Sequence, residues 1–337
     1  MFGYPKKRIG RTTVEMDVLG LGCAPLGGNF VDLNYNQAAE IIKFALDSGI
    51  RYFDTAPWYG FGRSERVVGD QLRNSQFIIS SKVGRILKPG AVDNPSNYGM
   101  VNPLPFHPVY DYSYDGIMRS FEDGLQRLGL DQIDILLVHD IGEFQHGEEN
   151  QRHFKDLSET GYKAMDELRN NDVVKAIGLG VNENKVCLDA LEIGNWDVFL
   201  LAGRYTLLEQ TPLDSLFPKC KNAGTSIICG GPFNSGVLVG REMWNYANAP
   251  KDVVNKVKSL KKIAENFNIP LPAAALQFPL FNEIITSVIP GARSKNEFKQ
   301  ILQWFTYKIP IDFWKELRAK ELIHHEAPVS NNKELSS

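Results

Sequence analysis

An alternation of short apolar runs with helical segments, repeated eight times, most constrains how this chain can fold. Each apolar run is rich in β-branched and other large apolar residues, as a strand buried on both faces requires. Each following segment places apolar residues at a spacing of three or four, which predicts an amphipathic helix. Residues 77–82 show the strand pattern, and residues 36–48 show the helical one. The predicted strands are 18–22, 50–53, 77–82, 133–139, 173–180, 197–201, 225–229 and 283–289.

Eight strand-then-helix units predict a (β/α)8 barrel, also called a TIM barrel. A doubly wound sheet is the alternative, but it usually carries a G-x-G-x-x-G turn after its first strand. Here G-L-G is followed by C-A-P, and no third glycine stands at the required place. We also expect an N-terminal β-hairpin at 7–14 and an extra C-terminal helix at 311–323. No linker divides the chain, so residues 1–329 are predicted to form one domain and the polar tail 330–337 to be disordered.

The connection after the third predicted strand is unusually long, from residue 84 to residue 114, and holds five prolines. Loops of this length inside a compact domain are usually functional or disordered. Its aromatic side chains, Phe106, His107, Tyr110 and Tyr112, favour a functional loop. We therefore expect this loop to contact the substrate.

Composition narrows the possible partners. A net charge of −3 offers no basic surface for nucleic acid or an anionic membrane, and no run approaches the ~18 apolar residues of a membrane span. None of the four cysteines forms a C-x-x-C pair, so we expect buried, reduced thiols in a protein of the cytoplasm. The six histidines lack metal-ligand spacing, and we expect no metal site. The expected partner is a small molecule, bound by a monomer or homodimer.

Four polar side chains stand at or just past the ends of predicted strands: Asp54, Tyr59, Lys82 and His139. Taken singly, each has a structural explanation, such as a loop cap, a packed ring, a surface charge or a hydrogen-bonded histidine. Taken together they form a chemical unit, because the carboxyl ends of barrel strands meet at one face. A phenol with a pKa of ~10 needs help to act as a base, and a nearby ammonium favours the phenolate. The carboxylate would keep Lys82 charged, and the imidazole would orient a substrate oxygen.

The same residues lie in motifs that are specific in combination. They are F-D-T-A-x-x-Y-G at 53–60, G-x-S-E at 62–65, S-K at 81–82 and D-x-x-x-x-H at 134–139. These motifs resemble those of the aldo-keto reductase superfamily, whose members are (β/α)8 barrels that use a nicotinamide cofactor. The resemblance extends from about residue 18 to residue 291. It implies that the tyrosine is the acid/base, that the lysine and aspartate tune it, and that the histidine orients the substrate.

Within the superfamily, segments 58–65, 112–115, 137–140 and 230–236 are most similar to the D-threo-aldose (L-fucose) 1-dehydrogenase group. L-galactose dehydrogenases and pyridoxal 4-dehydrogenases are similar too. The resemblance implies oxidation of a sugar hemiacetal at C1 to the lactone with NAD(P)+. Three alternatives stay open: a pyridoxal 4-dehydrogenase, a general NADPH-dependent aldehyde reductase, and a regulatory subunit of the kind that accompanies potassium channels.

Two segments after the last predicted strands indicate where the cofactor binds. The Gly-rich stretch 230–236 has backbone N–H groups that can cradle a pyrophosphate. NADP-preferring relatives usually offer a Lys and an Arg where this chain has Gly291 and Glu297. A carboxylate repels a 2′-phosphate and accepts hydrogen bonds from ribose hydroxyls, so we expect NAD, with NADP possible because Arg293 can pair with a phosphate. The expected cofactor contacts are Cys23, Asn182, Gly231, Phe233, Ser235, Gly236, Arg293 and Glu297, and the expected substrate contacts are Trp58, Tyr110 and His139.

Overall fold

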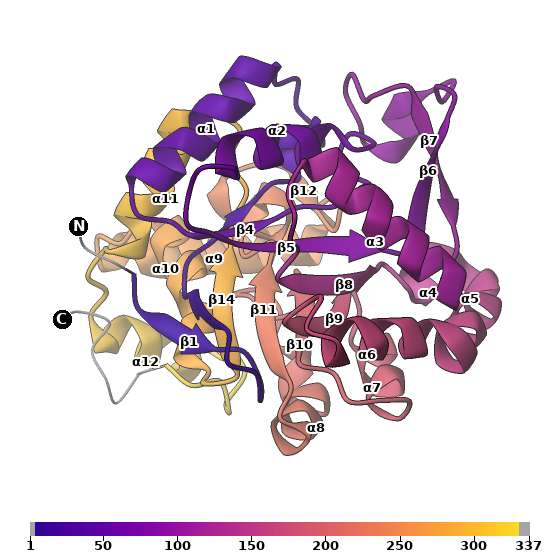
Figure 1. The fold of residues 1–337 in the computed structure, drawn as a ribbon. Helices are drawn as coiled ribbons and strands as arrows, with labels where there is room; N and C mark the ends of the chain where they lie inside the picture. The colour runs from indigo at the N-terminus through magenta and orange to yellow at the C-terminus, as the bar shows by residue number, and fades with distance from the viewer. Residues whose placement is uncertain (1–3, 330–337) are drawn as a thin grey trace.

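The computed structural model describes residues 4–329 and places eight parallel strands in a barrel with helices outside it (Figure 1). The strands pair in chain order, and bridges from Leu19 to Val288 and from Gly22 to Gly291 join the two edges of the sheet. The predicted (β/α)8 barrel is confirmed, and each predicted strand lies within three residues of its expected bounds. The strands are β3 (Leu21–Gly22), β4 (Tyr52–Asp54), β5 (Ile78–Val83), β8 (Ile135–His139), β9 (Ala176–Val181), β10 (Val198–Ala202), β11 (Ser226–Gly230) and β14 (Ile285–Ile289).

The predicted helices form the outer ring. They are α1 (Tyr35–Asp47), α2 (Arg63–Leu72), α3 (Tyr114–Leu128), α6 (Tyr162–Asn170), α7 (Asn184–Leu191), α8 (Leu216–Ala223), α9 (Lys251–Asn266), α10 (Leu271–Gln277), α11 (Lys295–Phe305) and the extra C-terminal α12 (Ile311–Ala319). Asn34 and Gln37 form a capping box at the start of α1, and the side chains of Ser113 and Ser294 cap α3 and α11. Two short helices after β8, α4 (Glu143–His146) and α5 (Asn150–Asp156), were not predicted.

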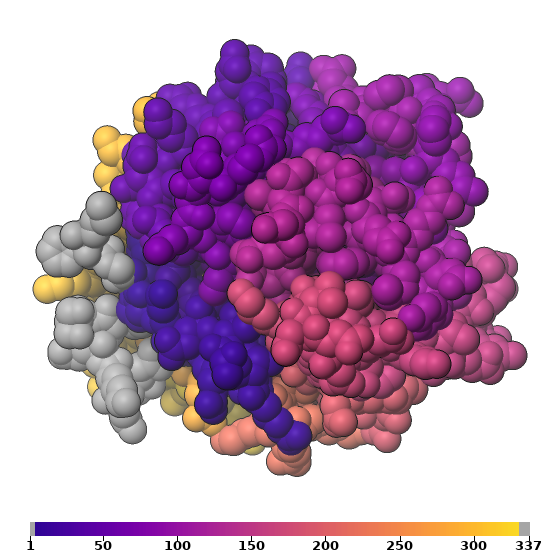
Figure 2. Space-filling model, viewed as in Figure 1, coloured from indigo at the N-terminus to yellow at the C-terminus, as the bar shows by residue number. Residues whose placement is uncertain are grey.

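The predicted N-terminal hairpin is present as β1 (Lys6–Arg8) paired antiparallel with β2 (Glu15–Asp17). Its apolar side chains, Ile9, Val14 and Met16, pack against residues inside the barrel such as Tyr52 and Ile135. Figure 2 shows the indigo surface of this segment below the purple early helices and above the orange part of the chain near α8. The hairpin therefore covers one opening of the barrel, which leaves the opposite opening for ligands.

The long connection after β5 is ordered and forms its own hairpin. Strand β6 (Arg85–Pro89) pairs antiparallel with β7 (Phe106–Tyr110), and the hairpin stands out at the upper right of Figure 1. A second excursion follows β11 and contains the 3-10 helix Asn234–Val239 and the small hairpin of β12 (Met243–Trp244) and β13 (Ala247–Asn248). Neither hairpin was predicted.

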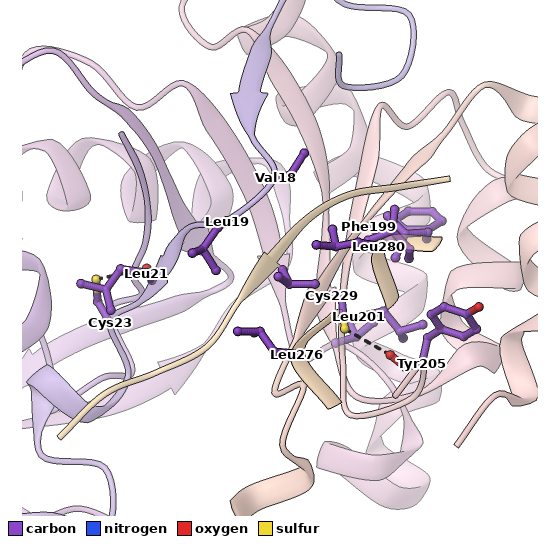
Figure 3. Packing of buried hydrophobic residues seen from close by; sticks show 14 of the residues in the cluster. Val18, Leu19, Leu21, Cys23, Phe199, Leu201, Tyr205, Cys229, Leu276 and Leu280 are labelled. Atoms are coloured by element: carbon purple, nitrogen blue, oxygen red, sulfur yellow. Dashed lines mark hydrogen bonds between the residues drawn. The ribbon is translucent and has the colours of Figure 1, made fainter. Parts of the chain in front are cut away.

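Apolar side chains between the barrel and its helices form the main core (Figure 3). Figure 3 shows Leu276 and Leu280 facing the barrel residues Phe199 and Leu201, with the thiol of Cys229 donating to the Tyr205 carbonyl oxygen. No helix among residues 4–329 combines the length and hydropathy needed to cross a membrane. The single-domain assignment of residues 1–329 stays a prediction, and the predicted disordered tail lies outside the described residues.

Candidate active site

Three neighbouring strands bring the predicted polar groups to one end of the barrel. Asp54 is the last residue of β4, Lys82 is the next-to-last residue of β5, and His139 is the last residue of β8. β5 pairs with both β4 and β8 in parallel, so these carboxyl ends share one edge. Tyr59 lies in the turn after β4, and its ring meets the His139 ring at right angles with the centroids 5.9 Å apart. The structure thus brings the four predicted residues together.

Lys82 and Asp54 form a buried ion pair. Lysine Nζ lies 2.8 Å from both carboxylate oxygens and 2.8 Å from the carbonyl oxygen of Thr55. Ser80 Oγ donates to the same carboxylate at 2.6 Å. The three ammonium protons are therefore all used, and the lysine meets Tyr59 only through its ring, with Nζ 4.9 Å from the ring centroid.

The pKa of Tyr59 differs from the expectation that Lys82 would favour the phenolate. Burial, followed by the negative charges of Asp54 and Asp140, raises the pKa of its phenol well above the usual value. The expected stabilisation of the phenolate by Lys82 does not dominate, because the ammonium is already neutralised by Asp54. In this state Tyr59 is a protonated phenol that can donate a proton. To accept a proton it must first become a phenolate, which needs added positive charge nearby.

His139 is kept neutral. Burial, together with the positive charges of Arg85 and Lys82, lowers the pKa of its imidazole well below the usual value. Its Nδ1 has no hydrogen-bond partner within the described residues, and its Nε2 lies 3.4 Å from an oxygen of Asp140. A neutral imidazole can donate to a substrate oxygen without altering the charge of the site.

Arg85 and Asp140 lie beside His139 at the carboxyl ends of the strands, which we call the barrel mouth. Neither was predicted from the sequence. Arg85 opens β6 and is fully buried, and its Nη2 donates to Asp140 Oδ2 at 2.6 Å. The guanidinium lies 4.2 Å above the Trp58 ring and 5.5 Å from the Tyr110 ring, so both predicted substrate contacts flank it. A signal was present for Asp140, which directly follows His139 at a barrel strand end, but Arg85 belongs to the unpredicted hairpin of β6 and β7.

Asn182, the predicted carboxamide ligand, belongs to a chain of hydrogen bonds across the mouth. Its Nδ2 donates to Asp140 Oδ1 at 3.0 Å, and its Oδ1 accepts from the Tyr246 hydroxyl at 3.1 Å. Tyr246 comes from the excursion after β11, and its ring stacks on Phe30 with the centroids 6.2 Å apart. The excursion therefore reaches over the catalytic end of the barrel.

The loop after β11, predicted to hold the diphosphate, has left-handed backbone. Asn234, Ser235 and Gly236 have positive φ angles of 46°, 58° and 104°. Two N–H groups of this stretch are used within the loop, because Asn234 N donates to Gly231 O and Gly236 N donates to Phe233 O, both at 2.9 Å. Gly231, with φ of 56°, supplies a turn that other residues rarely adopt.

Arginines surround the place predicted for the adenosine ribose. Glu297 accepts from the Arg293 backbone N–H at 2.8 Å and pairs with the Arg241 guanidinium at 3.0 Å. Arg241 comes from the same excursion after β11 and was not predicted. The carboxylate that favours NAD is thus already paired with a cation, which weakens the argument for NAD that rested on Glu297 alone.

These features fit a nicotinamide dinucleotide. The left-handed turn at Gly231 and 234–236 gives the loop a close approach to a diphosphate, and Arg204 Nε and Asn234 Oδ1, both buried and without a hydrogen-bond partner among residues 4–329, offer further polar contacts. Two predicted contacts receive less support from their side chains. The thiol of Cys23 is fully buried and donates to Leu21 O, and the Phe233 ring packs against Trp304 of α11.

Neither of two surface hollows is lined by the tetrad, that is by Asp54, Tyr59, Lys82 or His139. One, of about 460 Å³, is lined by residues such as Glu209 and His324, and the other, of about 430 Å³, by residues such as Asp47 and Arg51. The candidate active site is therefore assigned from the side chains that meet at the barrel end. The expectation of no metal site stays a prediction; within residues 4–329, His324, His325 and Glu326 come close enough to share an ion.

The chain is similar to known proteins along nearly its whole length. A sequence model of the aldo/keto reductase family matches residues 18–322. Pyridoxal 4-dehydrogenase of Microbacterium luteolum is 42% identical over 334 residues, which cover 94% of this chain and 98% of the relative. D-threo-aldose 1-dehydrogenase of a Pseudomonas species is 34% identical over 92% of this chain and 95% of the relative. The holo form of an aldo-keto reductase from Bacillus halodurans shares the fold, with a TM-score of 0.75, 22% identity and coverage of 98% of this chain and 99% of that one.

Proposed function

Because this chain belongs to the aldo/keto reductase family, whose members are NAD(P)-dependent oxidoreductases, we propose that it oxidises a cyclic hemiacetal to a lactone. The observation that supports this most is the meeting of Tyr59, His139 and the Lys82–Asp54 pair at one barrel end. A phenol beside a neutral imidazole suits proton transfer at an oxygen whose carbon exchanges a hydride.

The position of each side chain indicates its role in the reaction. His139 donates a hydrogen bond to the hemiacetal oxygen and holds it near Tyr59. A bound oxidised nicotinamide would supply the hydride acceptor and a positive charge beside the phenol. Because burial raises the pKa of the Tyr59 phenol, that positive charge would be needed for Tyr59 to release its own proton to solvent. The resulting phenolate would take the proton of the anomeric hydroxyl as C1 loses its hydride, so the C–O bond becomes the lactone C=O. The Lys82–Asp54 pair holds the site in shape and adds no net charge.

The substrate is pyridoxal or an aldose, since both form cyclic hemiacetals. The sequence motifs favoured an aldose of the L-fucose type. The relative named for pyridoxal is the more similar, at 42% against 34%, so we rank pyridoxal first. Aromatic rings around the site, including Trp58 and Tyr110, suit either a flat ring or the apolar face of a sugar. For the cofactor we keep NAD first, with NADP as the alternative.

A screen of cofactor reduction tests the proposal. Purified protein is given NAD+ or NADP+ with pyridoxal, L-fucose, L-galactose or D-arabinose, and reduced cofactor is followed by absorbance while the product is identified by mass. We expect one hemiacetal to give reduced cofactor and lactone in equal amounts. Faster NADPH-driven reduction of simple aldehydes than oxidation of any hemiacetal would instead support an aldehyde reductase, and bound cofactor without turnover would support a regulatory subunit.

A further inference from the structure

Arg85 is a charged side chain with unused donors at the reacting end of the barrel. It is fully buried, and within residues 4–329 only its side-chain Nη2 has a hydrogen-bond partner, Asp140 Oδ2. Its Nε and Nη1 have none among the described residues. Leaving a buried charged donor unpaired is costly, so an arginine kept here for packing alone would be a poor choice. The unused donors therefore indicate a ligand oxygen.

The Arg85 guanidinium lies close to the reacting groups. One carboxylate oxygen of Asp140 contacts both Arg85 Nη2, at 2.6 Å, and His139 Nε2, at 3.4 Å. The Arg85 charge is also near enough to act on the titration of both His139 and Tyr59. A substrate oxygen bound by Arg85 therefore belongs to the reacting end of the substrate, and not to a remote end.

The surroundings of Arg85 favour a flat ring. The guanidinium carbon lies 4.2 Å from the centroid of the Trp58 ring and 5.5 Å from that of the Tyr110 ring. Trp58 makes edge contacts with Phe61 and Tyr98, both at 5.8 Å between centroids. Aromatic rings beside a guanidinium suit a flat ring that bears an oxygen, because the ring can pack against them while the guanidinium donates to its oxygen.

Resting on the proposed function, we propose that Arg85 binds an ionised ring oxygen of the substrate and so selects an aromatic hydroxyaldehyde over a neutral sugar. In pyridoxal the ring hydroxyl is attached next to the carbon that bears the aldehyde, and it is ionised at neutral pH. An aldose offers only neutral hydroxyls at the corresponding place. A charged acceptor makes a stronger hydrogen bond to a guanidinium than a neutral one, so Arg85 discriminates between the two.

Kinetics with matched substrates test this role. Wild type, Arg85→Gln and Arg85→Lys are compared on pyridoxal and on an analogue that lacks the ring hydroxyl. We expect Arg85→Gln to lower kcat/KM for pyridoxal about 10- to 100-fold more than it lowers kcat/KM for the analogue, because only pyridoxal loses the charged hydrogen bond. Arg85→Lys should keep part of the discrimination, since it retains the charge without the fork. Arg119→Gln, on the exposed face of α3, is the control and should match wild type.

An equal loss on both substrates would overturn the proposal, because a structural role does not distinguish them. Binding gives a separate readout that needs no turnover. Calorimetry with 4-deoxypyridoxine, which keeps the ring hydroxyl but has no aldehyde, should show binding to wild type with NAD+ and at least tenfold weaker binding to Arg85→Gln. If no hemiacetal is oxidised but this difference is found, the proposed function fails and the Arg85 site stands. Equal affinities for the two proteins would contradict the Arg85 site.

Discussion

At the residue scale, the site depends on a buried pair of charges. Lys82 and Asp54 are each about 2% exposed, and every proton of the ammonium has an acceptor. Such a pair stabilises the fold little compared with apolar residues, yet removal of one partner leaves an uncompensated buried charge. Replacing one partner of this pair should therefore lower the free energy of unfolding far more than the intact pair raises it.

Asp54→Asn should lower the free energy of unfolding by about 3–5 kcal/mol, because Lys82 then lacks its counter-charge. The double variant Asp54→Asn/Lys82→Met should recover much of that loss. Urea unfolding of both variants and wild type measures the difference. Asp70→Asn, which breaks an exposed pair with Arg73, is the control and should cost below about 1 kcal/mol. A double variant no more stable than the single one would show that the charge is not the cause.

The residues of the tetrad could be predicted from the sequence because strand ends fix their positions. Asp54, Lys82 and His139 each follow a buried apolar run, and barrel geometry brings such ends together. Arg85 and Tyr246 could not be predicted in the same way. Each reaches the site from a hairpin whose path depends on contacts between distant segments, such as the stacking of Tyr246 on Phe30.

At the element scale, the segment between β11 and α9 contacts both the predicted cofactor residues of α11 and the loop after β9. Its Arg241 pairs with Glu297 of α11, and its Tyr246 bonds to Asn182 after β9. The start of this excursion, 230–236, has positive φ angles at four of its residues, and its expected role as a phosphate cradle stays a prediction. The later hairpin was missed because its strands are only two residues long.

Glu297→Arg should move the cofactor preference toward NADP. The change removes a carboxylate that repels a 2′-phosphate and adds a cation beside Arg241 and Arg293, which can pair with it. The ratio of kcat/KM for NADP+ to that for NAD+ is the measurement, and we expect it to rise at least tenfold. Glu40→Arg, at an exposed pair with Lys295, is the control for added charge. An unchanged ratio would mean that other contacts decide the preference.

At the scale of the whole molecule, periodicity alone predicted the barrel, since eight strand–helix units leave few other ways to bury both faces of each strand. The same burial affects the ionisation of three histidines, one at the end of β8 and two in the short helices that follow it. The pKa values of His139, His146 and His153 are all lowered, chiefly by burial, and that of His146 falls to about 4. The unfolded chain binds protons to these groups at a higher pH than the folded protein does.

The free energy of unfolding should therefore fall as the pH decreases below ~6.5, the unperturbed histidine value, toward the folded value of about 4 for His146. His146→Gln should make this decline shallower, because one such group is gone. Chemical unfolding at several pH values between these limits gives the slope. The exposed His325, replaced by Gln, is the control. Equal slopes for His146→Gln and wild type would contradict the assignment.

The central claim is that Tyr59 transfers the proton during hemiacetal oxidation. The most direct measurement is turnover by Tyr59→Phe, with cofactor affinity measured on the same protein by fluorescence. Acid–base catalysis contributes about 10²- to 10⁴-fold, so we expect a loss of kcat of that size or greater, with cofactor affinity within about threefold of wild type. Near-normal turnover in Tyr59→Phe would contradict the account, whichever substrate the screen identifies.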